Sequence, residues 1–261
     1  REPLRPDFWR APTDNDRGRR MDQAQGVWRD AHKEARLEGL SITPDPKQHT
    51  VIVRAAFRLP KVNARWQTTY TVYGSGDILV EAEFHPGKKQ PTLPRLGMQM
   101  TLPKGFDRVA WYGPGPQETY SDRCDARVGV YRGTVDRQFC YDYSEPGETG
   151  NKVDVRWLAI SDAQGVGLLA AGQPLLSVNA LPHATEDLES FKHGFQMPHR
   201  DVVTLNLDLA QMGVGGDNSW GARPHEPFQL RSHEPRQYRF RLRGFSSADG
   251  PVMQLARPAL P

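Results

Sequence analysis

The chain has 261 residues, enough for one large domain or two small ones. Lys and Arg number 34 against 31 Asp and Glu, so the formal net charge is only +3, and the basic residues are scattered along the chain. This pattern argues against a nucleic-acid-binding protein. Hydrophobic residues make up 37% of the chain, and no run of about 18 apolar residues occurs, which argues against a membrane-spanning helix.

The ends of the chain and its cysteines constrain the cellular compartment only weakly. The N-terminus has neither an initiator Met nor an apolar signal core, so we expect a piece of a longer chain. Cys124 and Cys140 do not have the Cys-x-x-Cys spacing of a zinc site. We expect two free thiols, and a disulfide stays open. A cytoplasmic location is favoured, with a periplasmic one as the alternative.

Helical periodicity is confined to two stretches. After an extended segment rich in Pro and Arg, apolar residues recur at spacings of three and four over 22–37. This spacing predicts a helix that ends at Gly39. Much later, acidic residues directly after Thr185 are typical of the first turn of a short helix.

Apolar residues alternate with polar ones, at a period of two, from residue 50 onward. The ranges 64–73 and 78–84 are joined by a Gly-Ser-Gly-Asp turn and predict a β-hairpin. Further strands are expected at 50–59, 96–102, 109–112, 154–160, 167–171, 202–207 and 237–242. Many short strands, 24 Gly and 22 Pro predict an all-β fold. We expect one domain over 1–261, an antiparallel sandwich of two large curved sheets with one or two short helices.

Three motifs rich in glycine, proline and aromatic residues stand out. The first reads Phe-Trp-Arg-Ala-Pro-Thr-Asp-Asn-Asp-Arg-Gly over 8–18. The second reads Trp-Tyr-Gly-Pro-Gly-Pro-Gln-Glu-Thr-Tyr-Ser-Asp-Arg over 111–123 and is followed by Pro-Gly-Glu-Thr-Gly-Asn over 146–151. The third reads Gln-Met-Gly-Val-Gly-Gly-Asp-Asn-Ser-Trp-Gly over 211–221. A tryptophan on a glycine-rich loop with polar neighbours suits a sugar, whose C–H face is apolar and whose rim is polar.

In this order and at these separations, the motifs resemble the C-terminal small-chain domain of the large β-galactosidases of glycoside hydrolase family two. The resemblance spans nearly the whole chain. It implies a large antiparallel super-sandwich of the galactose mutarotase type, the last domain of a five-domain chain or a separate subunit. It also implies that the catalytic glutamates lie in a barrel elsewhere. We therefore expect a domain that completes the active site for terminal β-D-galactosides, and no hydrolysis by this chain alone.

The resemblance implies that Trp220 reaches into the barrel's pocket and forms a platform for the sugar. From the residues themselves, Asp217, Asn218 and Ser219 are expected mainly to cap backbone groups of the loop, with direct sugar contact as the lesser alternative. The glycines at 213–216 do not form a dinucleotide loop, because G-x-G-x-x-G would need glycine at 218. Their expected task is to shape the loop that carries the tryptophan.

The first motif contains a run of acidic and amide side chains, Asp14, Asn15 and Asp16. An EF-hand is not supported, because Gly18 falls at the fifth loop position rather than the sixth. The residues predict a turn rich in Asx hydrogen bonds. The resemblance implies a mobile loop beside the active site, over 18–25, with Gly18 as its hinge.

The remaining polar candidates are expected to be structural. Glu118, Asp122 and Arg123 predict an ion-pair cluster that fixes a long loop, and the segment 146–151 is interpreted in the same way. His183 could serve as a general base beside carboxylates, as an aldose epimerase would need. Its place just before the predicted helix at Thr185 favours a structural role.

Cofactors and partners follow from the resemblance. We expect no metal held by this chain alone, whereas the parent enzyme takes magnesium and sodium mainly through its barrel. The expected partners are the barrel and other domains of a β-galactosidase and a β-galactoside sugar, and the parent is expected to be a homo-oligomer. Two other functions stay open, a stand-alone aldose 1-epimerase and a non-catalytic carbohydrate-binding or assembly module, because fold alone separates none of them.

Overall fold

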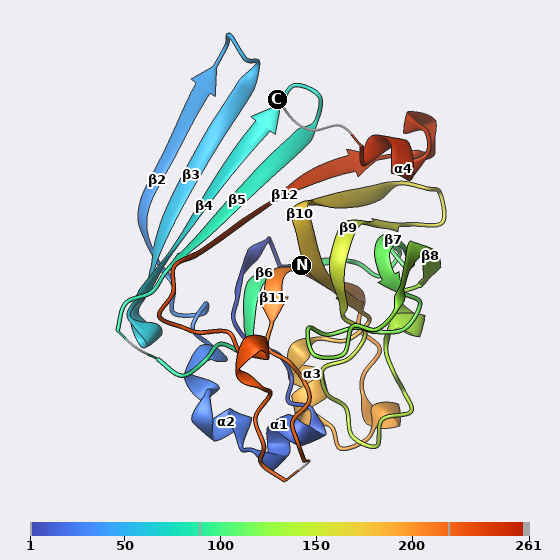
Figure 1. The fold of residues 1–261 in the computed structure, drawn as a ribbon. Helices are drawn as coiled ribbons and strands as arrows, with labels where there is room; N and C mark the ends of the chain where they lie inside the picture. The colour runs from blue at the N-terminus through green and yellow to red at the C-terminus, as the bar shows by residue number, and fades with distance from the viewer. Residues whose placement is uncertain (1, 89, 219, 258–261) are drawn as a thin grey trace.

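The computed structural model describes residues 2–88, 90–218 and 220–257 (Figure 1). Within these residues it has twelve strands: β1 (Arg5–Asp7), β2 (Arg36–Asp45), β3 (Thr50–Leu59), β4 (Ala64–Tyr73), β5 (Asp77–His85), β6 (Arg95–Pro103), β7 (Arg108–Gly115), β8 (Arg127–Thr134), β9 (Lys152–Ser161), β10 (Gly167–Leu181), β11 (Val202–Gln211) and β12 (Arg236–Phe245). The α-helices are α1 (Asp14–Gly18), α2 (Met21–Ala24), α3 (Thr185–Ser190) and α4 (Val252–Leu255). The chain is therefore mostly β, as predicted, although it has more short helices than expected.

Hydrogen bonds join the described strands into one curled antiparallel sheet. Its main path runs β1–β6–β11–β10–β12–β5–β4–β3–β2, and β9, β7 and β8 branch from β10. The long strand β10 is the junction, because residues 167–173 pair with β12 whereas residues 177–181 pair with β11. The expectation of two sheets is corrected accordingly: the two curved layers share β10 at a corner and are parts of one sheet (Figure 1).

The core is built around a group of aromatic rings. The Phe8 ring lies 5.8 Å from that of Trp28, 5.6 Å from that of Trp66 and 5.9 Å from that of Phe84, measured between centroids. All four side chains are buried. Such tilted and edge-on contacts add to the stabilisation from buried apolar area. The first motif, which begins at Phe8, is therefore rooted in the centre of the molecule.

The alternating segments form strands where the sequence predicted them. The ranges 50–59 and 64–73 are β3 and β4, and 78–84 lies inside β5. Trp66 pairs with Phe84 across β4 and β5, and both face the core. The match has a physical cause, since a sheet buried on one face requires apolar residues at every second position. Strands β1, β2 and β8 were not predicted.

The helix predicted over 22–37 is wrong. The chain forms only the short α2 and a 3-10 turn at 26–28 before further turns lead into β2. Trp28 and Ala31 are buried, as their spacing suggested, but they reach the core from turns. A succession of turns returns side chains to one side every three or four residues, and spacing alone cannot separate it from a helix. Gly39 lies within β2, opposite Ala56, and ends no helix.

Candidate functional site

Trp220 lies on the loop between β11 and the turn at 226–228, and it is 87% exposed. Its backbone N–H donates to Asn218 Oδ1 at 2.9 Å, and the Ala222 N–H donates to the same oxygen at 3.3 Å. The Asn218 side chain therefore caps backbone groups on both sides of the tryptophan, which confirms its predicted structural role. The loop is fixed through its backbone, and the indole is left accessible.

The two other predicted neighbours of the tryptophan differ from Asn218. Asp217 Oδ1 lies 2.8 Å from His225 Nε2, and both side chains are exposed. The Asp217 carboxylate thus links the tryptophan loop to His225, just before the turn at 226–228. Ser219 lies outside the described residues. Direct contact of any of these side chains with a sugar stays a prediction.

Asp122 fastens the base of the tryptophan loop. Its Oδ1 accepts the Val214 N–H at 3.0 Å, and its Oδ2 accepts the Gly215 N–H at 2.7 Å. A Cβ at Gly213 would lie 2.4 Å from Asp122 Oδ2, a distance at which only glycine fits. The glycines thus allow a close approach to a carboxylate, as expected of residues that shape the loop. The N–H groups that a phosphate would need are already bound to Asp122.

A buried ion pair links the first motif to the same loop. Arg10 and Asp16 are at most 1% exposed and lie 3.0 Å apart. Arg10 also donates to the carbonyls of Met212 and Gly213, to the latter at 2.9 Å. Burial raises the pKa of Asp16, but the guanidinium groups of Arg10 and Arg19 outweigh burial and hold the pKa below its usual value. The carbonyl groups of Met212 and Gly213 therefore accept hydrogen bonds from the buried Arg10 guanidinium, whose positive charge is neutralised by Asp16.

The run from Asp14 to Gly18 forms helix α1, which corrects the predicted turn. Thr13 is its N-cap: the Thr13 hydroxyl accepts the Asp16 N–H at 3.2 Å, and Asp16 Oδ2 accepts the Thr13 N–H at 3.1 Å. This reciprocal capping supplies partners for two otherwise free backbone donors. The acidic residues that suggested an Asx-rich turn are those that favour the first turn of a helix.

Helix α1 lies against the tryptophan loop. Asn15 Nδ2 donates to the Val214 carbonyl at 3.0 Å, and the Gly18 carbonyl oxygen lies 3.8 Å from where a Cβ of Gly221 would be. The chain continues from α1 into α2, and the residue with left-handed backbone between them is Arg20, with φ of 56°. Mobility of 18–25, with Gly18 as a hinge, stays a prediction.

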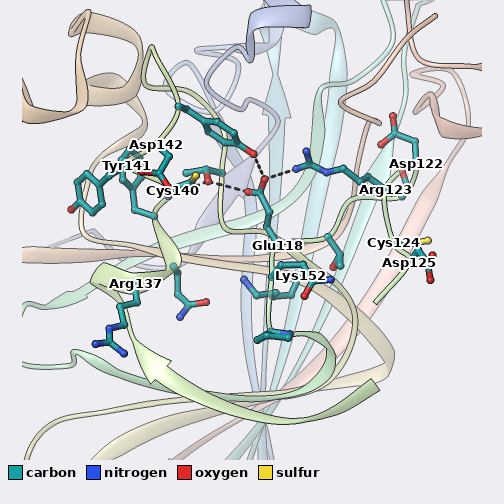
Figure 2. A pocket seen from close by; sticks show the side chains of 18 of the residues that line it. Glu118, Asp122, Arg123, Cys124, Asp125, Arg137, Cys140, Tyr141, Asp142 and Lys152 are labelled. Atoms are coloured by element: carbon teal, nitrogen blue, oxygen red, sulfur yellow. Dashed lines mark hydrogen bonds and ion pairs between the residues drawn. The ribbon is translucent and has the colours of Figure 1, made fainter. Parts of the chain in front are cut away.

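Glu118 ties the second motif to the segment 146–151. Its Oε1 accepts from Arg123 and from the Tyr143 hydroxyl (Figure 2). Its Oε2 accepts from Thr149 Oγ1 at 2.9 Å and from the Gly150 N–H at 2.7 Å. Burial raises the pKa of Glu118, but these hydrogen bonds and Arg123 bring it below its usual value. Both oxygens are engaged, so this carboxylate fixes loops together.

The predicted cluster of Glu118, Asp122 and Arg123 is therefore confirmed only in part. Glu118 and Arg123 form an ion pair, whereas Asp122 turns to the tryptophan loop. The same region borders a cavity of about 1270 Å³, lined mainly by the loops 116–125 and 136–143 (Figure 2). Lys152 lies at its inner wall and donates to the Gly150 carbonyl at 2.8 Å. Burial lowers the pKa of Lys152 to about 8.

A buried polar layer connects β6 and β11 to these segments. Arg95 on β6 lies 3.2 Å from Asp7 and 3.0 Å from Glu148. Its Nε lies 3.3 Å from Asp208 on β11. Burial raises the pKa of Asp208 well above its usual value; Arg95 opposes this rise, and the carboxylates of Asp7 and Glu148 add to it. Sequence reasoning missed this layer, although charged residues at inward-facing strand positions were a signal that could have revealed it.

His183 has the structural environment that its sequence context favoured. It is buried directly before α3, its ring lies 4.9 Å from that of Phe139, and its Nε2 is 3.5 Å from the Tyr141 hydroxyl. Burial lowers its pKa. Cys124 and Cys140 are free thiols, the first exposed and the second partly buried.

None of the helices in residues 2–88, 90–218 and 220–257 is long and apolar enough to cross a membrane. In the same part of the chain, no group of three or more His, Cys, Asp or Glu side chains gathers as a metal site would require. The assignment of magnesium and sodium to other domains of the parent stays a prediction.

The fold places the chain among all-β domains built on a curled antiparallel sheet, with the motif-bearing loops gathered at one end (Figure 1). The family model described as beta galactosidase small chain matches residues 2–242. The chain belongs to this family.

Two relatives are much longer than the region that this chain matches. It is 38% identical over 241 residues to a β-galactosidase of Priestia megaterium, covering 92% of this chain and 23% of that protein. It is 38% identical over 234 residues to a β-galactosidase of Lactobacillus delbrueckii subsp. bulgaricus, covering 89% of this chain and 23% of that protein. The chain therefore spans about a quarter of the length of these relatives.

Solved structures offer a more distant likeness. A galactose mutarotase-like protein from Lactobacillus casei aligns over 79% of this chain and 73% of its own, with a TM-score of 0.41 and 9% sequence identity. A likeness of this size carries no argument about function.

Proposed function

We propose that the chain is the part of a β-galactosidase that completes the pocket for terminal β-D-galactosides without supplying the catalytic glutamates. The observation that carries the proposal is the exposed Trp220 on a loop that Asn218, Asp122 and Arg10 hold in place. Exposing a large aromatic to water is unfavourable unless it meets a partner. A rigidly presented indole suits the apolar C–H face of a pyranose.

The proposal divides the chemistry between two parts of the enzyme. A retaining glycosidase needs two carboxylates about 5–5.5 Å apart, one as nucleophile and one as acid/base. We assign these to the barrel of the parent. The role that we assign to this chain is to stack on the sugar, to orient it and to exclude water from one side of the pocket. Asp217 and Asn218 are three and two residues before Trp220, and we propose that their polar groups contact the rim of the sugar that stacks on the indole.

The proposed partners follow from the same division. They are the barrel and other domains of the parent β-galactosidase and its β-galactoside substrate, in a parent that is a homo-oligomer. Magnesium and sodium are assigned to the other domains, and the cytoplasm is the proposed location.

The test is hydrolysis of nitrophenyl-β-galactoside by the purified chain, by the longer polypeptide that contains it, and by the chain mixed with the barrel-bearing remainder. We expect no turnover by the chain alone and turnover by the other two. In the longer polypeptide, Trp220→Ala should lower kcat/KM about tenfold or more, ~1.4 kcal/mol of transition-state stabilisation, and Trp220→Phe should lose less. Phe195→Ala is the matched control, because Phe195 is an equally exposed aromatic that lies outside the tryptophan loop. This variant should leave kcat/KM unchanged.

Other outcomes would replace the proposal. Turnover by the chain alone would mean that two of its own carboxylates form a working pair. Interconversion of sugar anomers by the isolated chain would identify an epimerase. Sugar binding without either activity, in every preparation, would identify a carbohydrate-binding module.

A further inference from the structure

The outer part of the sheet, formed by β2, β3 and β4, carries apolar side chains on a surface open to solvent. Leu40 and Ile42 on the edge strand β2 are 59% and 65% exposed, and Leu37 is also exposed. Val51 on β3 and Val72 on β4 continue the exposed surface. Single apolar residues on a surface are normal, but a contiguous group marks an interaction surface.

Strand register shows that this surface is an extension of the core face. One row of paired residues runs across five strands: Ile42 on β2, Val53, Tyr70, Val80 and Phe240 on β12. Directly paired residues share a face of the sheet. The row ends in the fully buried Val80 and Phe240 and begins at the exposed Ile42. The same apolar face is therefore covered at one end of the row and open at the other.

A bulge in β2 adds a third residue to the open face. Leu37 and Leu40 are three positions apart, so a regular strand would place them on opposite faces. A register shift between Leu37 and Gly39 brings Leu37 opposite Phe57 and Leu40 opposite Ala55, which lie on the same face of β3. The irregularity thus gathers the exposed leucines on one side. Such an arrangement is expected if that side is to be covered.

The opposite face of the same strands is mainly polar. Ser41 and Thr43 on β2 point to that side, and Arg54 and Thr69 pair with each other across β3 and β4. Ser41 and Thr43 are as open to solvent as their apolar neighbours, because every residue from 36 to 44 is exposed. One face of β2 is therefore apolar and the other polar although both are exposed, so burial within this chain does not account for the apolar residues.

We propose that the apolar face of β2–β4, defined by Leu37, Leu40, Ile42, Val51 and Val72, is the docking surface for another domain of the longer β-galactosidase polypeptide. The inference rests on the proposed function. About three quarters of the length of the relatives lies outside the part that this chain matches. A domain on the same polypeptide is present at high effective concentration and reaches the surface before a second molecule does. A folded domain also suits a broad, gently curved sheet face.

The test compares thiol labelling at two neighbouring positions that point to opposite faces. Ile42→Cys and Thr43→Cys are introduced separately into a background carrying Cys124→Ser and Cys140→Ser, in this chain and in the longer polypeptide. Both positions are exposed here, so both thiols should react rapidly with a maleimide in the isolated chain. In the longer polypeptide, the thiol from Ile42→Cys should react at least tenfold more slowly, and that from Thr43→Cys within twofold of its rate in the isolated chain.

Three other labelling outcomes overturn the proposal. Equal reactivity of the Ile42→Cys thiol in both proteins would show that no domain covers the face. Equal protection at both positions would show an interface that does not select the apolar side. Concentration-dependent protection in the isolated chain, with a dimer by light scattering, would identify a second copy as the occupant. Hydrolysis of nitrophenyl-β-galactoside is measured in parallel, and protection without hydrolysis would refute the proposed function alone.

Discussion

The two ends of this molecule are held together by different means. At one end, which we call the anchored end and which lies around helix α1 in Figure 1, contacts between side chains and distant backbone join the segments. They involve Asn15 of helix α1, Glu118, Asp122 and the tryptophan loop. At the other, the outer sheet of β2–β5, neighbouring strands are joined by regular backbone pairing. Arg10 and Gly213 are 203 residues apart, whereas β2 to β5 follow one another directly in sequence.

The difference shows which features each end needs. A pleated sheet satisfies its backbone groups within the ladder, and its side chains need only alternate. A loop that presents an accessible side chain has no ladder, so its N–H and C=O groups require partners from elsewhere. Here a carboxylate, Asp122, and a guanidinium, Arg10, supply them. Substitutions should therefore be costly at the anchored end and mild in the outer sheet.

The largest expected effect comes from Arg10→Ala. This change leaves the buried Asp16 carboxylate with Arg19 as its remaining cation and removes the donors to Met212 and Gly213. Breaking a buried pair in this way costs about 3–5 kcal/mol. Urea unfolding of the chain, followed by circular dichroism, should show a loss of that size.

Arg65→Ala is the matched control in the outer sheet. Arg65 lies 3.1 Å from Glu38 with two thirds of its side chain exposed, and such surface pairs are worth about 0–1 kcal/mol. Equal losses for Arg10→Ala and Arg65→Ala would contradict the contrast between the two ends.

The same contrast explains what the sequence could predict. The bounds of β3 and β4 follow from alternation, because their pairing is local and their inner face is buried. The exposed tryptophan and the cap by Asn218 were also within reach, since both are encoded in one short segment. The contacts of Arg10 and Asp122 with the tryptophan loop left no local trace, because the loop residues that they bind lie more than 90 positions away in sequence. The helix over 22–37 failed because buried turns imitate helical spacing.

Gly213→Ala should have the second largest effect. The added methyl group would lie 2.4 Å from Asp122 Oδ2 and 3.0 Å from Phe228 Cβ, so the loop or the carboxylate must shift. Overpacking of this kind costs about 1–3 kcal/mol. Gly39→Ala in β2 is the control, since a Cβ there meets no atom within 4 Å, and it should lie within about 0.5 kcal/mol of the parent chain. Urea midpoints of the two variants measure the difference, and a harmless Gly213→Ala would mean that Asp122 is not tightly seated.

The smallest effect, and one of opposite sign, is expected from Asp208→Asn. The pKa of Asp208 is raised in the folded chain, chiefly by burial. Above pH 3.8, the ordinary pKa of an aspartate, the unfolded chain releases this proton while the folded chain retains it. Stability therefore falls as pH rises from that value toward the folded pKa, and asparagine, which cannot ionise, removes the fall. We expect the variant to be the more stable at pH 7. Asp77→Asn is the control in the outer sheet, where one carboxylate faces the two arginines Arg241 and Arg243 at 3.1 and 3.0 Å.

The asparagine at position 77 should destabilise the chain at pH 7, because it leaves the buried Arg241 guanidinium with less compensating charge. Thermal unfolding from pH 5 to pH 8 separates the two cases, since the same chemical change is expected to raise stability at one site and lower it at the other. A loss of stability for both variants would show that Arg95 keeps all three of its carboxylates ionised. The charges of the buried layer around Arg95 would then be balanced, like those of Asp77 and its two arginines in the outer sheet.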